Sequence, residues 1–294
     1  MKNLLKDNNI IYKIPLFSIL FAALVCIPLR VYQYCKLINP TTGFFDDVNI
    51  TVYVVYAVLA ICIAVCAGFA FIRRKSVKPV AVNCFSKGFS AVSIIMALGV
   101  AVESFSVLSD YLSLFSSSGS SYISVAEYAS SQGGTIMLAQ AVSGILATVY
   151  FAISGFAAIN KTLLPKIRLF TIIPVIWCIF RLLFRFRRTI SFVNVSDLLL
   201  ELFAIVFTMA FFLALAQVIA KIDSYTIFWK IFAYGFPAVI LSLICFIPRF
   251  ILILTGNSEQ LNPLYGANLC DLTFAIYAVY ICITAVKAKT SANE

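Results

Sequence analysis

The chain has 294 residues, of which 62% are hydrophobic and only 12% charged, and its mean hydropathy is +1.01. Soluble domains carry about a quarter charged residues, so this composition excludes an ordinary soluble fold and makes lipid the solvent for most of the chain. The net charge of +10 does not indicate nucleic-acid binding, because the sequence has no basic domain or aromatic-basic platform. The absence of histidine weakens any hydrolase, protease or haem interpretation.

Eight apolar segments follow one another, each near the ~20 residues with which a helix crosses about 30 Å of hydrocarbon. They predict an all-α polytopic membrane bundle. The lysines before the first segment are typical of a signal peptide, but no small-x-small cleavage site follows, so we expect a retained helix. The fifth segment is the weakest because Arg181 and Arg185 shorten its apolar part, and without it the count is seven. The predicted segments are 14–34, 50–72, 88–113, 135–159, 167–186, 198–220, 231–254 and 269–286.

The segments form four hairpins, at residues 14–72, 88–159, 167–220 and 231–286. No connection is long enough for a soluble domain, so residues 1–294 are expected to form a single membrane domain.

Lys and Arg in the connections predict the orientation of the chain. One set of connections, which includes both chain ends, carries fifteen of them. The other set carries three, namely Lys36, Arg187 and Arg188. This bias places both termini in the cytoplasm of a cell-membrane protein, requires an even number of crossings, and so favours eight over seven.

The nine cysteines mostly lie in or beside apolar runs, where they act as small hydrophobes. No CxxC pair and no phosphate-binding glycine motif occurs, so we expect neither a metal nor a cofactor. Cys35 and Cys270 fall near the expected outer surface, where a disulfide between them is one alternative.

Two hairpins share an order of parts. Ile-Pro and an arginine end the outgoing segment, with Pro28 and Arg30 in one copy and Pro248 and Arg249 in the other. An Asn-Pro loop and a glycine follow in each copy, and an Asp/Asn-rich entry, which includes Asp271 in the later copy, begins the return segment. These features favour parallel hairpin repeats, with chance similarity among apolar helices as the alternative.

The fifth and sixth segments resemble a third, degraded copy of the hairpin. Arg181, Arg185 and Arg188 share one helix face, and Asp197 and Glu201 share one face of the next helix. We expect these two faces to meet in structural ion pairs. Asp271 begins its helix where the positive end of the helix dipole favours an acid.

Glu103 is the most informative charge, because a carboxylate inside a membrane segment costs about 3 kcal/mol and must face protein or water. Asp110 lies seven residues on, and Gln140 of the fourth segment can reach the same level. A proton, cation or substrate site is one interpretation, and a buried ion pair with Arg30, Arg181 or Arg249 is the other. The same three arginines line an outer vestibule for anions or lipid headgroups in one alternative, and form separate hairpin salt bridges in the other.

Three functions fit these observations. A small-solute transporter or permease is the first, supported by intramembrane charge, prolines within helices and internal repeats. A membrane-embedded binding or regulatory subunit without transport is the second, and a lipid-acting enzyme using Glu103, Asp110 or Glu201 is the third. The partners we expect are membrane lipid and either a small solute or another membrane subunit. Water reaching Glu103 from outside favours transport, whereas Glu103 sealed against an arginine favours the subunit.

Overall fold

A computed structural model describes residues 10–39, 45, 49–72, 74, 86–117, 133–160, 170–188, 195–220, 224–261 and 266–287. These residues form eight α-helices, a short 3-10 helix named η4, and a 3-10 turn at residues 170–172. In chain order the elements are α1 (Ile10–Lys36), α2 (Ile50–Ile72), α3 (Lys87–Ser117), α5 (Gly134–Asn160), α6 (Ile173–Arg188), α7 (Val195–Ile219), α8 (Ser224–Leu254), η4 (Ser258–Gln260) and α9 (Leu269–Lys287).

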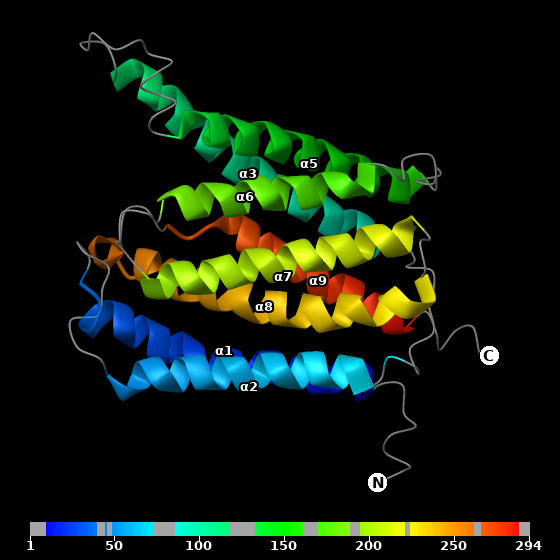
Figure 1. The fold of residues 1–294 in the computed structure, drawn as a ribbon, viewed down its shortest axis with the longest axis horizontal. Coiled ribbons are helices and arrows are strands. Elements are labelled where there is room, and N and C mark those ends of the chain that lie inside the picture. Colours follow the sequence, from blue (N-terminus) through cyan, green and yellow to red (C-terminus); the bar gives the residue numbers. More distant parts are fainter. Residues whose placement is uncertain are drawn as a thin grey trace.

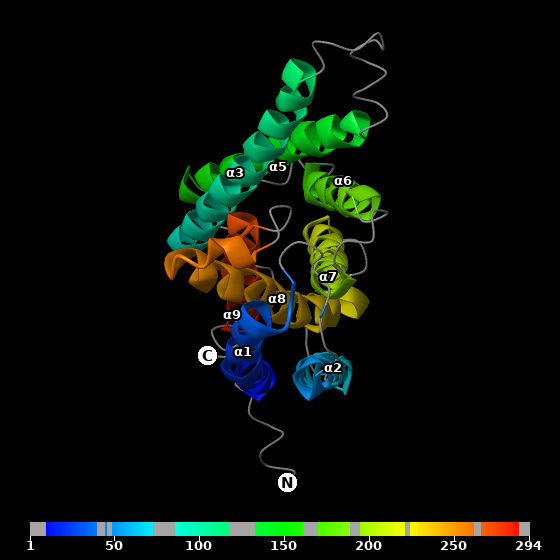
Figure 2. The same ribbon diagram turned by 90° about the vertical axis from the view of Figure 1, so that its left-hand side faces the viewer.

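The helices lie side by side with their long axes in roughly the same direction, so that the fold is a helical bundle (Figure 1). Seen along the bundle, α3 and α5 lie at one edge, α1 and α2 at the other, and the remaining helices between them (Figure 2). Helix α8 contacts α1, α2, α7 and α9 and is therefore the central helix. Its apolar stretch is 67% buried within the protein, against 28% for α1 and for α2.

Of the helices that the structure describes, six are long and apolar enough to cross a membrane, which indicates a multi-pass membrane protein. They are α1, α2, α3, α5, α7 and α8. The apolar part of α9, Leu269–Thr284, is shorter. Helix α6 has 16 residues, so at 1.5 Å per residue it extends about 24 Å, less than the ~30 Å hydrocarbon core.

Most helix bounds agree with the predicted segments to within a few residues, and α2 agrees at both ends. Helix α6 begins six residues later than predicted, because residues 170–172 directly before it form a 3-10 turn. Pro174 lies in its first turn, where proline is tolerated. Helix α8 begins seven residues earlier than predicted and contains Lys230. A lysine near a helix end does not terminate the helix, since its long stem can carry the ammonium to the interface.

Each predicted hairpin is a packed helix pair, because α1 contacts α2, α3 contacts α5, α6 contacts α7, and α8 contacts α9. Helices α3 and α5 approach closely at a glycine, since a Cβ on Gly155 would lie 2.9 Å from Ile94 and 3.2 Å from the Ser90 carbonyl oxygen. Several parts of the proposed hairpin repeat, namely Pro40, Gly43, Asp47 and Pro263, fall outside the described residues.

Candidate functional site

The buried charges lie at one end of the bundle because successive helices run in opposite directions. Arg30, Arg181 and Arg249 lie in the second halves of α1, α6 and α8, whereas Glu201 and Asp271 lie near the beginnings of α7 and α9. These helix ends are all on the left in Figure 1. The antiparallel chain path therefore brings residues from distant parts of the sequence to one level.

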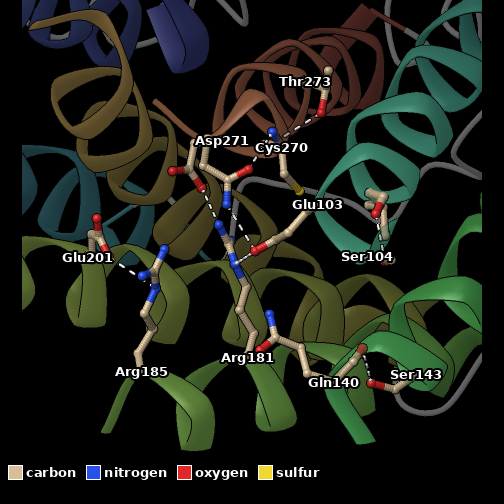
Figure 3. Close-up of polar contacts among 12 residues, drawn as sticks. Glu103, Ser104, Gln140, Ser143, Arg181, Arg185, Glu201, Cys270, Asp271 and Thr273 are labelled. Carbon is tan, nitrogen blue, oxygen red and sulfur yellow. Dashed lines mark hydrogen bonds and ion pairs between the residues drawn. The ribbon is translucent and has the colours of Figure 1, made fainter. Parts of the chain in front are cut away.

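Arg181 joins three helices through two carboxylates (Figure 3). Its Nε donates to Glu103 Oε1 of α3 at 2.8 Å, and its Nη2 donates to Asp271 Oδ1 of α9 at 2.8 Å. Arg181 is 4% exposed, Glu103 8% and Asp271 7%. Charge-assisted hydrogen bonds in a site without bulk water are strong, so this triad fixes α6 against α3 and α9.

The first turn of α9 holds this triad in place. Asn268 Oδ1 accepts a hydrogen bond from the Cys270 backbone N–H at 3.0 Å, which satisfies one free donor of the helix N-terminus. The Asn268 side-chain nitrogen donates to Glu103 Oε1 at 2.9 Å. The Arg181 guanidinium also lies over the ring of Trp177, with its Cζ 5.5 Å from the ring centroid. Asn268 therefore packs against the Glu103 end of the pair, and Trp177 against the Arg181 end.

Glu201 of α7 is the centre of a second group. Its Oε1 accepts a hydrogen bond from Arg249 Nη1 of α8, and its Oε2 lies 3.2 Å from Arg185 Nε of α6. Arg249 is 2% exposed, whereas the Arg185 side chain is 13% exposed. A charge as buried as Arg249 is tolerated only when it is paired.

Tyr34 connects α1 to this second group. Arg249 Nε donates to the Tyr34 hydroxyl at 3.2 Å, and Arg30 Nη2 donates to the same oxygen at 3.3 Å. Arg30 Nη1 donates to Gln33 Oε1 at 2.9 Å. A chain of polar contacts therefore runs from Gln33 of α1 through Arg30, Tyr34 and Arg249 to Glu201 of α7.

The structure separates some of the residues that we grouped from the sequence. Arg185 lies against Glu201, whereas Arg181 contacts Glu103 and Asp271. Asp110, two turns after Glu103 and on nearly the same face of α3, is exposed, so a shared helix face did not predict its burial. The side chains of Arg188 and Asp197 lie outside the described residues.

Gln140 is buried and lies beside Arg181 (Figure 3). Cys35 and Cys270 are both free thiols, so the alternative of a disulfide between them is wrong in this structure. Cys270 is fully buried beside Glu103, whereas Cys35 is half-buried on α1.

Tyr34, Gln33 and Trp177 were not selected from the sequence. Tyr34 lies four residues after Arg30, and Trp177 lies four residues before Arg181. Residues at this spacing are neighbours on a helix surface, which was the available signal. Among the described residues, no group of three or more metal-ligating side chains could hold a metal ion.

The arrangement defines a class of protein rather than a particular one. Helices that are long and apolar enough to cross a membrane, packed around paired charges, indicate a multi-pass helical membrane protein. No protein-family model, no curated protein and no solved structure matches the chain. The function must therefore be argued from the site itself.

Proposed function

We propose that the protein is a membrane-embedded binding or regulatory subunit with no transport activity of its own. The observation that carries this proposal is the burial of Glu103. This side chain is 8% exposed and accepts hydrogen bonds from both Arg181 and Asn268. A carboxylate that binds a transported proton or cation must exchange with water. Glu103 is instead packed into a contact that joins three helices.

The paired charges give such a subunit a defined shape in the bilayer. Lipid offers helices no hydrophobic drive toward one another, so packing and polar contacts decide which helices associate. Breaking a buried ion pair by removing one partner is costly, so these pairs act against wrong pairings of helices. With only short connections between helices, a partner would contact this protein within the membrane, together with lipid.

The same proposal includes the threading of the chain. Eight helices cross the cell membrane, both termini are cytoplasmic, and the charged cluster lies in the outer half of the bilayer. The distribution of Lys and Arg in the connections supports this orientation. Origin by hairpin duplication is supported by the equivalent Arg30 and Arg249, which donate to one Tyr34 hydroxyl.

A thiol-labelling experiment tests the proposal at the cluster, because Cys270 is 0% exposed and lies beside Glu103. Intact cells or right-side-out vesicles would be treated with a membrane-impermeant cationic methanethiosulfonate, and modified cysteines would be located by peptide mass spectrometry. Cys270 should stay unmodified in the presence of diverse small solutes. Glu259→Cys, at an exposed position of η4, is the accessible control.

A small-solute transporter is the second candidate, because the ion pairs share partners. Arg181 is shared by Glu103 and Asp271, and Glu201 is shared by Arg185 and Arg249. Shared partners allow pairs to exchange between two helix arrangements, as alternating access requires. Modification of Cys270 at a rate that depends on an added solute would support transport and overturn the subunit proposal.

A further inference from the structure

Three buried polar atoms near the Arg181–Glu103 pair have no hydrogen-bond partner among the described residues. They are Glu103 Oε2, Gln140 Oε1 and Trp177 Nε1. Their residues are 8%, 3% and 1% exposed. A buried polar atom without a partner costs about 1–3 kcal/mol, so three in one region require an explanation.

The three side chains come from helices that pack together, since α5 contacts both α3 and α6. Figure 3 shows the Gln140 side chain extending from α5 to lie beside the Arg181 side chain, with its amide nitrogen on the side of Glu103. Trp177 lies one turn before Arg181 on α6, with its ring beneath the Arg181 guanidinium. The three polar groups therefore surround the same arginine.

The contact between Gly144 and Trp177 shows which edge of the Trp177 ring faces α5. A Cβ on this glycine would lie 2.1 Å from Ser104 Oγ and 3.3 Å from Trp177 Cδ1. Cδ1 is bonded to Nε1, so the indole edge that carries the N–H faces α5 beside Ser104. Ser104 follows Glu103 on α3 and donates its own hydroxyl hydrogen to the Val100 carbonyl. Its oxygen does not accept from the Trp177 indole N–H, which has no partner among the described residues.

We propose that Glu103 Oε2, Gln140 Oε1 and Trp177 Nε1 bind a single water molecule. A water donates two hydrogen bonds and accepts two, which matches two acceptors and one donor. Buried waters typically make about three hydrogen bonds to groups that the protein leaves unsatisfied. The indole N–H argues against a metal cation, because a donor cannot ligate a positive ion.

The charges around the site fit a neutral ligand. Arg181 of α6 and Asp271 of α9 already pair, and Asn268 donates to the other oxygen of Glu103. Cys270 of α9 lies on the side of Glu103 away from Gln140 (Figure 3). The bound water hydrates the free oxygen of Glu103 without opening the cluster to bulk solvent. The site is therefore independent of whether the protein is a subunit or a transporter.

Tryptophan NMR tests the site directly, because the chain has only two tryptophans, Trp177 and Trp229. Protein labelled with ¹⁵N-tryptophan would be studied in nanodiscs, and Trp229→Phe would assign the two indole signals. We expect a nuclear Overhauser cross-peak between the Trp177 indole proton and water, with the sign of a long-lived complex rather than of exchange.

Gln140→Met removes the acceptor at similar volume and should abolish this cross-peak. Gln33→Met is the matched control, because Gln33 is equally buried but contacts Arg30 on α1, and it should leave the cross-peak unchanged. Absence of the cross-peak in the unaltered protein would overturn the proposal, whether or not the variants fold. Its persistence at full intensity in a folded Gln140→Met protein would do the same.

Discussion

Replacing Arg181 by methionine removes a guanidinium that contacts both Glu103 and Asp271. Methionine keeps a long, unbranched side chain at this position. Two buried carboxylates then lose their cationic partner. Removing one partner of a buried pair typically costs about 3–5 kcal/mol. Asn268 still donates to Glu103 in the variant, so the loss for that carboxylate is partial.

Protonation limits the electrostatic part of this cost. A carboxyl group in water loses its proton near pH 4, and each pH unit corresponds to about 1.4 kcal/mol. Taking up a proton at pH 7 therefore costs roughly 4 kcal/mol for each carboxyl group, or roughly 8 kcal/mol for two. We expect a loss of about 3–5 kcal/mol in the free energy of unfolding.

Arg185→Met is the matched control on the same helix, one turn further on. Its partner Glu201 retains Arg249, and the Arg185 side chain is partly exposed. This substitution should cost only about 1 kcal/mol. Unfolding by sodium dodecyl sulfate in mixed micelles, followed by circular dichroism, gives both values. An Arg181→Met protein no less stable than Arg185→Met would refute the assignment of Arg181 as a joint between three helices.

Three further results are expected. Gly144→Ala should destabilise the protein by about 1–3 kcal/mol because its new methyl meets Ser104 Oγ; Ser104→Ala should recover part of this loss, and Gly68→Ala, in open space, should cost nothing. Tyr34→Phe should cost about 1–3 kcal/mol because two arginines each lose one acceptor. The exposed Tyr53→Phe should cost less than about 0.5 kcal/mol. Green fluorescent protein fused after the last residue should fluoresce, as it does in the cytoplasm, and alkaline phosphatase there should be inactive; the reverse result would contradict the orientation.

Helix existence followed from the sequence because a membrane segment is recognised by a single local property, sustained apolarity over about 20 residues. The sequence predicts the ends of a helix less well where a polar side chain can lie within the last turns. It places Lys230 in a connection, but Lys230 lies inside α8.

The partners of the charges could not be derived from the sequence. Helical spacing shows which residues share a face, such as Arg181 and Arg185, but not which neighbouring helix that face meets. Arg181 turned out to contact Glu103, 78 residues away, and Asp271, 90 residues away. These partners depend on α9 packing against α3 and on the central place of α8, which no local pattern encodes. Tyr34 was within reach of sequence reasoning, because it lies one helical turn after Arg30.

The central place of α8 has a consequence for how the protein is made. Helix α8 is the seventh of the eight described α-helices to leave the ribosome, yet it contacts the first two. Until it arrives, Glu201 lacks Arg249, and until α9 follows, Arg181 lacks Asp271. A chain interrupted before α8 can still form the Arg181–Glu103 and Arg185–Glu201 pairs, but it lacks the contacts that join α8 and α9 to them. The last hairpin to be translated, α8 and α9, therefore supplies the central helix around which the earlier helices pack.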